Sequence, residues 1–465
     1  MYRFYVPSDG YEYHYAELCR VFLPEEDFEI ISIDKLPDPG FVNENSYVLG
    51  TSGSPDRDTV KRELYAVLSD ITGMKPEWGT LTGVRPLKPA LDFLGRTGSL
   101  DDMKRSLKEL YLIADSNVCL LSEIAEYQTE HVHGNPSDYI SVYTGIPFCP
   151  TRCEYCSFAS NVADEDAIAL YLDNLGKEIR YTGHLYKEHY KGKVIESIYI
   201  GGGTPTTLSS GQLENLIGNI SDAFSVNPKD LEFTVEAGRP DTITEDKLLT
   251  LKKCGIARIS INPQSMKDET MKLIGRNHTS DDIRRAFAAA DKIGFDVINA
   301  DLIAGLPGES PADFSSSLDE IIALGAENIT VHTLSVKRGS RLHENDPLYY
   351  RRDIERVSDM LSYARERLKD EGYYPYYIYR QKHQMGAFEN VGYCKDGKHS
   401  IYNIRIMEDK QSIIALGAGA VGKLYYPGED RIERIANVSN YEIYSERFDE
   451  MLRRKDKYFG GKNVD

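Results

Sequence analysis

Residues 143–158 read YTGIPFCPTRCEYCSF, and they contain three of the seven cysteines of the chain, Cys149, Cys153 and Cys156. Their spacing is CxxxCxxC. Thiolates held close together on a short loop are the soft ligands that iron–sulfur clusters require. Four irons and three cysteines leave one iron without a protein ligand, so a small molecule can bind there. The segment therefore predicts a 4Fe–4S cluster with one open iron.

Two other interpretations of these cysteines are weaker. A structural zinc site usually joins CxxC to a second cysteine pair or to histidines, and no such pair follows nearby. Disulfides are disfavoured by the odd number of cysteines and by the start of the chain, Met1 to Val6, which is too short and too polar for a secretory signal. The cysteines Cys19, Cys119 and Cys254 have apolar, helix-like surroundings and are expected in the core.

The composition limits the classes of partner. The chain has 465 residues, more than a single core usually serves, so two or three domains are expected. Its 55 basic and 73 acidic residues give a formal net charge of −18, which argues against a nucleic-acid backbone as partner. No stretch approaches the roughly 20 apolar residues of a membrane span. We expect a soluble, cytoplasmic protein without a nucleic-acid or membrane partner.

A regular alternation of strands and helices begins after Gly134-Asn135-Pro136, where turn-forming residues suggest a domain boundary. Six apolar or β-branched runs follow, separated by helical patterns, and strands with crossover helices indicate a parallel sheet. Six units are fewer than the eight of a closed barrel, so we expect an α/β fold with an open, six-unit partial barrel. The predicted strands are 139–143, 197–200, 231–236, 258–261, 297–303 and 328–331.

The regions on either side differ from this alternation. Two short strands, 2–6 and 28–33, accompany helical patterns near the N-terminus and predict an α/β accessory domain. The loop Trp78 to Pro86 is either an ordinary structured turn or a contact with a ligand or with the core domain. Beyond residue 340 the chain becomes rich in tyrosine and predicts an α+β cap. The expected domains are therefore 1–135, 136–340 and 341–465.

Glycine and polar residues follow several predicted strands. The run Gly201 to Thr204 comes after the second strand, where glycines let a ligand approach the backbone and free N–H groups can bind a carboxylate. A carboxylate at the end of a buried strand is costly unless it is paired. Strand ends carry the chemistry of closed barrels, so we expect the polar residues at these ends to gather at one site. They are Glu236, Gln264, Arg276 and Asp301.

The cysteine segment and the glycine run together resemble the radical S-adenosylmethionine (SAM) superfamily, and within it the oxygen-independent coproporphyrinogen III dehydrogenase group. The matching motifs are Ile146-Pro147-Phe148-Cys149, Cys153-Glu154-Tyr155-Cys156 and Asp301-Leu302-Ile303-Ala304-Gly305-Leu306-Pro307. The resemblance implies that SAM binds the open iron and is cleaved to methionine and a 5′-deoxyadenosyl radical. It assigns no catalytic residue beyond the cluster and the SAM site. The residues that it assigns to SAM are Tyr143, Tyr155, Gly202, Gly203, Thr204, Glu236, Gln264, Arg276, Asp301 and Ser335.

The last 125 residues contain 15 of the 32 tyrosines. Tetrapyrrole rings stack on aromatic side chains and their propionates pair with Arg or Lys, so this region either covers such a substrate or forms an amphipathic β-surface. The segments Tyr379 to Lys382, Glu389 to Tyr393 and Ala415 to Ala420 resemble the HemZ-like subfamily, and this similarity spans nearly the whole chain. It implies oxidative decarboxylation of coproporphyrinogen III to protoporphyrinogen IX in heme biosynthesis, with an electron donor such as flavodoxin or ferredoxin.

The chain also departs from the better-known dehydrogenases, which leaves two alternatives open. Gly145 stands where they have a histidine, and Phe158 stands where they have a fourth cysteine. One alternative is a heme-binding chaperone on the same scaffold, with His383 or Cys394 as an iron ligand. The C-terminal His-Asn motif of heme-chaperone relatives is replaced here, where the nearest segment ends at Asn403 without the histidine. The other alternative is a different radical reaction on a tetrapyrrole.

Overall fold

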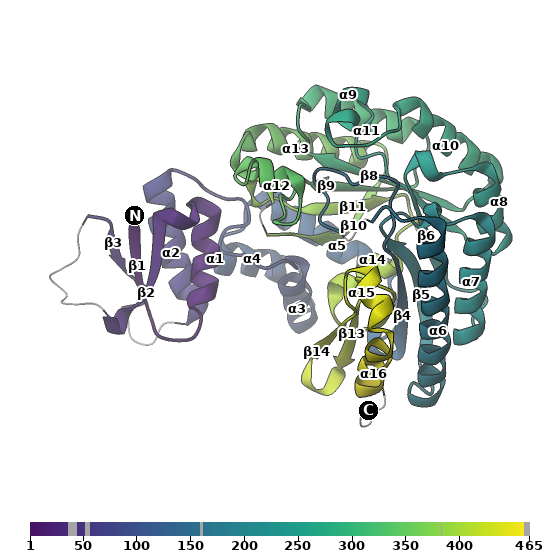
Figure 1. Cartoon of the computed structure of the whole chain (residues 1–465). Coiled ribbons are helices and arrows are strands. Elements are labelled where there is room, and N and C mark those ends of the chain that lie inside the picture. The colour runs from purple at the N-terminus through teal and green to yellow at the C-terminus, as the bar shows by residue number, and fades with distance from the viewer. Residues whose placement is uncertain (36–43, 52–55, 159–160, 383, 460–465) are drawn as a thin grey trace. The chain divides into compact units, whose positions relative to one another are not determined.

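The computed structural model forms two compact units, whose helices and strands are labelled in Figure 1. The smaller unit contains residues 1–126 and 378–389, and the larger unit contains the remainder. The three-domain division expected from the sequence stays a prediction. In the described part of the chain, no helix is both long and apolar enough to cross a bilayer. The structure describes all residues except 36–43, 52–55, 159–160, 383 and 460–465, and except the side chains of 457–459.

The smaller unit is built on a parallel sheet with the strand order β2-β1-β3. Its core combines apolar side chains of the strands, among them Phe4 and Phe28, with those of α1 and α2, such as Leu18 and Leu64. The Asp56 side chain caps α2 by accepting a hydrogen bond from the backbone N–H of Thr59. The elements are β1 (Tyr2–Val6), α1 (Glu12–Phe22), β2 (Phe28–Ser32), β3 (Ser46–Val48), α2 (Arg57–Thr72), α3 (Leu87–Thr97), α4 (Leu100–Tyr111) and α5 (Asp115–His131), whose last residues belong to the larger unit.

The loop around Trp78 packs inside the smaller unit against a segment from the far end of the chain. The indole Nε1 of Trp78 donates a 2.8 Å hydrogen bond to Glu389, which lies 311 positions later. The Arg380 guanidinium lies over the indole ring, 5.3 Å from its centroid, and donates two hydrogen bonds to the Ala387 carbonyl. These contacts pack the loop against residues 380–389 of the same unit.

The larger unit contains an 11-stranded sheet with the order β10-β11-β9-β8-β7-β6-β5-β4-β12-β13-β14. Its six central strands are parallel and lie at the predicted positions, separated by helices. The α/β fold expected from the sequence is therefore confirmed. These strands are β4 (Tyr139–Ile146), β5 (Val194–Gly202), β6 (Glu232–Gly238), β7 (Arg258–Ile261), β8 (Val297–Ala304) and β9 (Asn328–Thr333).

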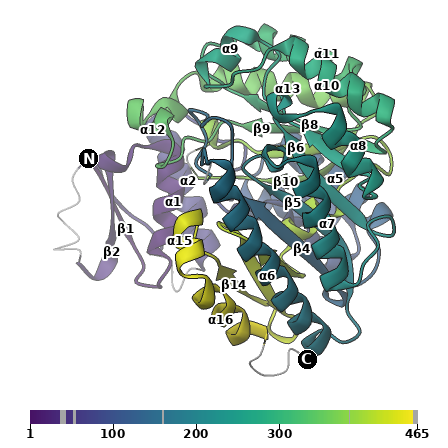
Figure 2. The ribbon, with the colours of Figure 1, turned by 45° about the vertical axis from the view of Figure 1, so that its right-hand side comes forward.

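Crossover helices pack along this sheet, with α6 and α7 side by side (Figure 2). The Ser209 side chain begins α7 with a capping box formed with Gln212. Apolar residues at helical spacing, among them Leu213, Ile217 and Phe224, form the buried face of this helix. The helices are α6 (Glu165–His189), α7 (Ser210–Phe224), α8 (Glu245–Lys253), α9 (Asp268–Leu273), α10 (Ser280–Ile293) and α11 (Pro311–Ala323).

The C-terminal region extends the same sheet at both edges. β11 pairs antiparallel with β9, and β12 pairs parallel with β4, with Ala415 opposite Tyr143. The parallel part therefore has seven strands, because β12 joins the six that the sequence predicted. The elements are α12 (Arg341–Asn345), α13 (Ile354–Asp370), β10 (Tyr374–Tyr379), β11 (Asn390–Cys394), α14 (Ile401–Glu408), β12 (Ser412–Leu416), β13 (Val421–Tyr426), β14 (Arg431–Ala436), α15 (Tyr441–Glu446) and α16 (Phe448–Phe459).

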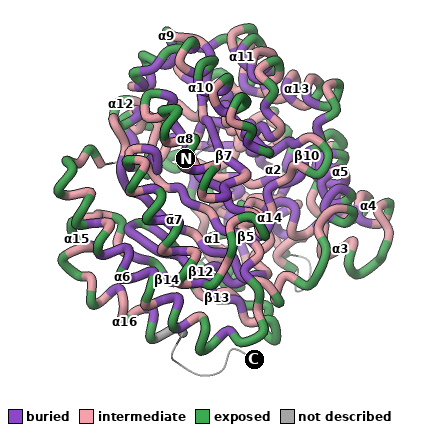
Figure 3. Tube along the Cα trace, turned by 90° about the vertical axis from the view of Figure 1, so that its right-hand side faces the viewer, coloured by how far each residue is buried: buried purple, intermediate pink, exposed green. Residues whose placement is uncertain are grey.

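Buried positions recur along the strands, whereas exposed positions recur along the helices (Figure 3). Of the three cysteines expected in the core, Cys19 is buried, Cys254 is half-buried and Cys119 is exposed. The prediction is wrong for Cys119 because its neighbours Val118 and Leu120 occupy the buried side of α5 and turn this position toward solvent.

Candidate functional site

The cysteine loop leaves the end of β4 and is closed by Asn161. The backbone N–H of Cys149 donates to the Asn161 carbonyl at 3.0 Å, and the Asn161 N–H donates to Pro147 at 3.0 Å. Cys149, Cys153 and Cys156 are all free thiols. Burial raises the pKa of the Cys149 thiol to about 11, and the charges of the other two cysteines act in the same direction. The three thiols therefore lie near enough to interact.

These thiols suit a cluster better than a single ion. Among the residues that the structure describes, no three His, Cys, Asp or Glu side chains are grouped to hold one metal ion. A four-iron cluster places each thiolate on a different iron and so keeps the sulfurs further apart than one ion would. A donor set of three thiols, without imidazole or carboxylate, is also the set that iron–sulfur clusters use. The cysteine loop thus fits the predicted group.

Arg276 supplies a second observation that fits an anionic group here. Its guanidinium is buried and donates to the Tyr155 hydroxyl at 3.3 Å, and its charge interacts with Cys153. No carboxylate pairs with it among the described residues, and its Nε has no hydrogen-bond partner there. A buried cation without a counter-charge is costly, so a negatively charged group beside Cys153 would compensate it.

The glycine run lies against the cysteine loop. The N–H of Gly203 donates to Ile146 at 2.8 Å, that of Thr204 donates to Phe148 at 2.7 Å, and that of Gly202 is bonded to Glu236. The expectation of free N–H groups is therefore wrong for these three residues, because the neighbouring loop and Glu236 already use them. The Thr204 hydroxyl lies 3.4 Å from the Cys149 sulfur.

Glu236 lies within β6 beside a stack of tyrosines. The Tyr199 hydroxyl donates to Glu236 at 2.6 Å, and the Tyr199 ring stacks on Tyr143, with centroids 6.3 Å apart, and on Tyr402, at 4.7 Å. Burial raises the pKa of Glu236 to about 7 even though hydrogen bonds from Tyr199 and Gly202 oppose the change, and the negative charge of Asp301 adds to it. The carboxyl group can therefore gain or lose a proton near neutral pH.

Gln264 and Asp301 are held together by backbone contacts. The Gln264 N–H donates to the Asp301 carbonyl at 2.9 Å, and Gln264 has a φ of 68°, a left-handed conformation that is rare without glycine. Its side-chain Oε1 is buried and lacks a hydrogen-bond partner, as expected if a ligand donates to it. Asp301 lies inside β8 rather than at its end, where it accepts from Asn299 at 3.0 Å and faces His332 at 3.6 Å.

The predicted site residues thus fall into connected groups. Tyr155 and Arg276 lie at the cysteine loop, Tyr143 and Glu236 share contacts with Tyr199, and Gln264 joins Asp301. Arg276 follows α9 and not a strand, so the expectation that all four polar residues lie at strand ends is wrong for Arg276 and Asp301. Ser335 follows β9 and is half-buried.

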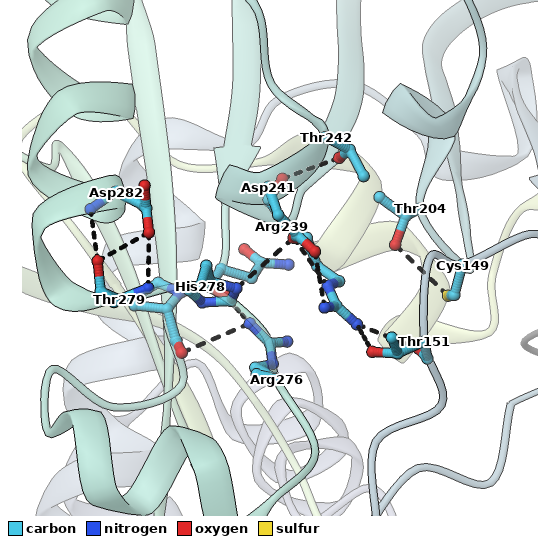
Figure 4. A network of polar contacts seen from close by, with 12 residues as sticks. Cys149, Thr151, Thr204, Arg239, Asp241, Thr242, Arg276, His278, Thr279 and Asp282 are labelled. Atoms are coloured by element: carbon cyan, nitrogen blue, oxygen red, sulfur yellow. Dashed lines mark hydrogen bonds and ion pairs between the residues drawn. The ribbon is translucent and has the colours of Figure 1, made fainter.

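Several residues at the site were not predicted. Arg239, Asp241 and His278 form a polar network beside the cysteine loop (Figure 4). Arg239 lies three residues after Glu236 in the segment Glu236 to Pro240. Its closeness in sequence to a predicted site residue could have indicated that it lies at the site. Tyr402 lies on α14, far along the chain from the strands that it meets, and no local pattern indicates its place.

Comparisons with known proteins agree with this geometry. Residues 143–321 match the Radical SAM superfamily. The chain is 41% identical over 406 residues to the oxygen-independent coproporphyrinogen-III oxidase-like protein HemZ of Bacillus subtilis (strain 168), covering 86% of this chain and 81% of that protein. It is 31% identical over 301 residues to the heme chaperone HemW of the same organism, covering 65% and 74%. Among solved structures, the coproporphyrinogen III oxidase HemN of Escherichia coli has the same fold, with a TM-score of 0.52 and 23% identity over 70% of this chain and 73% of that one.

Proposed function

Because the chain belongs to the radical SAM superfamily and to its HemZ-like group, whose members use a 4Fe–4S cluster and SAM, we propose that it is an oxidoreductase acting on coproporphyrinogen III. In this proposal two propionate side chains each lose a hydrogen atom, CO2 and one electron to become vinyl groups, which gives protoporphyrinogen IX; the hydrogen atom would go to the radical derived from SAM and the electron to an external one-electron acceptor. The observation that carries the proposal is the joint position of three free thiols and the buried, uncompensated Arg276. The similarity to HemZ over most of the chain supports the choice of substrate.

In this proposal each group of side chains has a separate role. Cys149, Cys153 and Cys156 would hold the cluster, and Arg276 would balance its negative charge. When bound, the cluster and SAM supply the radical that removes hydrogen from the substrate. Glu236 and the Gln264 Oε1 are acceptors that would orient the polar groups of SAM. The other proposed SAM contacts are Tyr143, Tyr155, Gly202, Gly203, Thr204, Asp301 and Ser335.

The C-terminal tyrosines support a substrate-covering role only in part. Tyr444 donates to the buried Glu178 at 2.7 Å, Tyr441 packs on Phe148, and Tyr376 is buried. These side chains build the fold, as the amphipathic interpretation of the region predicted. The proposal that the region covers a tetrapyrrole therefore rests on the resemblance to HemZ, as does the proposed electron donor of the flavodoxin or ferredoxin type.

Product analysis tests the proposed reaction. Protein reconstituted with iron and sulfide under strict anaerobiosis is incubated with coproporphyrinogen III, SAM and a reductant, and products are identified by mass spectrometry. We expect the stepwise loss of two carboxyl groups as CO2. Cleavage of SAM without a vinyl product would refute the substrate and leave the reaction class intact. Transfer of deuterium from labelled SAM into a methylated or ring-opened product would favour a different radical reaction on a tetrapyrrole.

Heme delivery is the second candidate, favoured by the similarity to HemW over 74% of that protein. Of the two ligands suggested by the sequence, Cys394 is buried and its sulfur lies 3.3 Å from the Tyr127 hydroxyl, whereas His383 lies outside the described residues. A titration with heme followed through its Soret band decides between the candidates. Stoichiometric, tight binding without turnover of coproporphyrinogen III would favour the chaperone.

A further inference from the structure

Arg239 links the end of β6 to the cysteine loop. Its guanidinium is buried, with 3% of the residue exposed. Nη1 donates to the hydroxyl of Thr151 at 2.7 Å and to the Thr151 carbonyl at 3.1 Å (Figure 4). Thr151 lies between Cys149 and Cys153. Arg239 therefore holds, by hydrogen bonds, the stretch of backbone that connects these two cysteines.

Asp241 holds the arginine, and His278 lies next to Asp241. Its Nε and Nη2 donate to the two carboxylate oxygens of Asp241 at 3.0 and 2.9 Å, a bidentate geometry that fixes the plane of the guanidinium. The buried His278 lies behind, with Nδ1 3.6 Å from Asp241. Burial alone would raise the pKa of Asp241, but His278 and Arg239 outweigh it and hold that pKa well below its usual range. The pair is therefore ionised and nearly neutral as a unit.

The loop that follows α9 holds the same backbone from the other side. The Thr151 hydroxyl donates to the Gly275 carbonyl at 3.0 Å, and the Glu154 N–H donates to Ile274 at 3.0 Å. The backbone from Thr151 to Glu154 is thus held by Arg239 on one side and by residues 274–275 on the other. Of these contacts, only those of Arg239 come from a charged side chain held rigidly by a carboxylate.

We propose that Arg239 is a positioning residue for the cluster, because it holds the Thr151 backbone where Cys149 and Cys153 can reach two irons of one cluster. This inference rests on the proposed role of the three cysteines. Asp241 pairs with the guanidinium and offsets much of its charge, which still acts to lower the pKa of Cys149, so we expect Arg239 to act mainly through geometry. Arg276 is the group beside the loop that supplies uncompensated charge.

The geometric role can be measured without the cluster. Hydrogen exchange followed by mass spectrometry on cluster-free protein reports the order of residues 147–156 directly. We expect Arg239→Gln to speed exchange in that segment by about tenfold. Arg239→Lys keeps the charge but cannot form the bidentate pair, so it should speed exchange nearly as much. Unchanged exchange in both variants would overturn the proposal, whatever reaction the enzyme performs.

Arg258 provides a matched control. It is also a buried arginine, it begins β7, and it donates to the Lys398 carbonyl at 2.8 Å, in contact with residues outside the cysteine loop. Arg258→Gln should loosen residues 398–400 and leave residues 147–156 unchanged. If both variants loosened the cysteine loop equally, Arg239 would be a general stabiliser of the fold and the proposal would fail.

The loaded protein gives a second readout. We expect Arg239→Gln and Arg239→Lys to lower the affinity for the cluster by roughly 10- to 100-fold, measured as the loss of iron to a chelator after anaerobic reconstitution. If Arg239 acts by geometry, the two variants should lose iron at similar rates. Wild-type retention in Arg239→Lys alone would show that the charge matters, and would overturn the geometric role.

Discussion

An ideal Cβ placed on Gly203 would lie 3.0 Å from the sulfur of Cys149 and 2.5 Å from the carbonyl oxygen of Phe148. The carbonyl belongs to backbone that the N–H of Thr204 already holds at 2.7 Å, so it cannot move aside without breaking that bond. The absence of a side chain at Gly203 therefore sets the distance between β5 and the cysteine loop.

We expect Gly203→Ala to displace the cysteine loop and to prevent assembly of a stable cluster. The measurement is the iron content and the iron–sulfur absorbance after anaerobic reconstitution. Gly218→Ala in α7 is the control, because a Cβ there meets no atom within 4 Å and should stabilise the helix by about 0.5–1 kcal/mol. A full cluster in Gly203→Ala would show that the loop tolerates the shift.

Serine at each of Cys149, Cys153 and Cys156 should remove cluster absorbance and SAM cleavage together, because a hydroxyl is a poor ligand for iron in place of a thiolate. Cys119→Ser is the control, since Cys119 is an exposed cysteine outside the CxxxCxxC motif. Activity that survived in the triple serine variant would refute the assignment of all three residues.

Gly145 lies where the turn after β12 leaves little room for a side chain. A Cβ on Gly145 would lie 3.0 Å from the Ala418 carbonyl, because the turn after β12 packs on this part of β4. We expect Gly145→His to destabilise the protein by about 1–3 kcal/mol through overpacking, and to bring no gain of activity. Urea unfolding measures the loss. Wild-type stability in this variant would show that the turn can move away.

Binding of SAM should depend on pH through Glu236. Its folded pKa of about 7 lies above the usual value near 4.5, because burial disfavours the charged form. In the proposed SAM site, ionised Glu236 would accept hydrogen bonds from SAM better than the protonated form, so the affinity for SAM should fall by up to roughly tenfold between pH 8 and pH 6. The folded state keeps a proton that the unfolded chain releases, so this group's contribution to stability falls as pH rises from about 4.5 to 7.

Equilibrium dialysis with SAM under anaerobic conditions measures this dependence, and Glu236→Gln should remove it. Tyr199 and the Gly202 N–H are hydrogen-bonded to Glu236, and the negative charge of Asp301 acts on it from nearby. Asp301→Asn should lower the pKa of Glu236 and move the transition toward acid. A pH-independent affinity in the wild-type protein would place the SAM contact elsewhere.

Structural features that depend on a local sequence pattern could be predicted, whereas features that depend on pairing between distant segments could not. The six parallel strands were found because apolar runs and crossover helices leave a periodic signal. The strand β12 was not predicted as part of the parallel sheet. It pairs with β4, about 270 positions earlier, with Ser412 opposite Ile140, and no local pattern in the sequence indicates that partner. In the same way, the spacing of the cysteines is a local pattern that predicts a cluster loop, whereas the proposed role of Arg239 depends on a contact with Thr151 that only the fold creates.

A buried ion pair joins the C-terminal helix α16 to α6, within the unit that carries the cysteine loop. Lys455 on α16 lies 3.2 Å from Glu178 on α6, and their side chains are 2% and 0% exposed. Glu178 also accepts from the Gly417 N–H at 2.7 Å and from Asn437 at 2.8 Å. Because Gly417 belongs to the turn that packs on Gly145, this pair also holds the turn beside β4.

We expect Lys455→Met to destabilise the protein by about 3–5 kcal/mol, because it leaves the Glu178 carboxylate buried without a counter-charge. The double variant with Glu178→Gln should recover much of this loss. The control is Arg454→Met on the same helix, where the partner Glu450 lies 2.8 Å away and the side chains are 35% and 32% exposed. Solvent screens that pair, so its loss should cost about 1 kcal/mol or less in urea unfolding. Equal losses at the two neighbouring positions would mean that α16 is held by its apolar face, and that the buried pair contributes no more than a surface one.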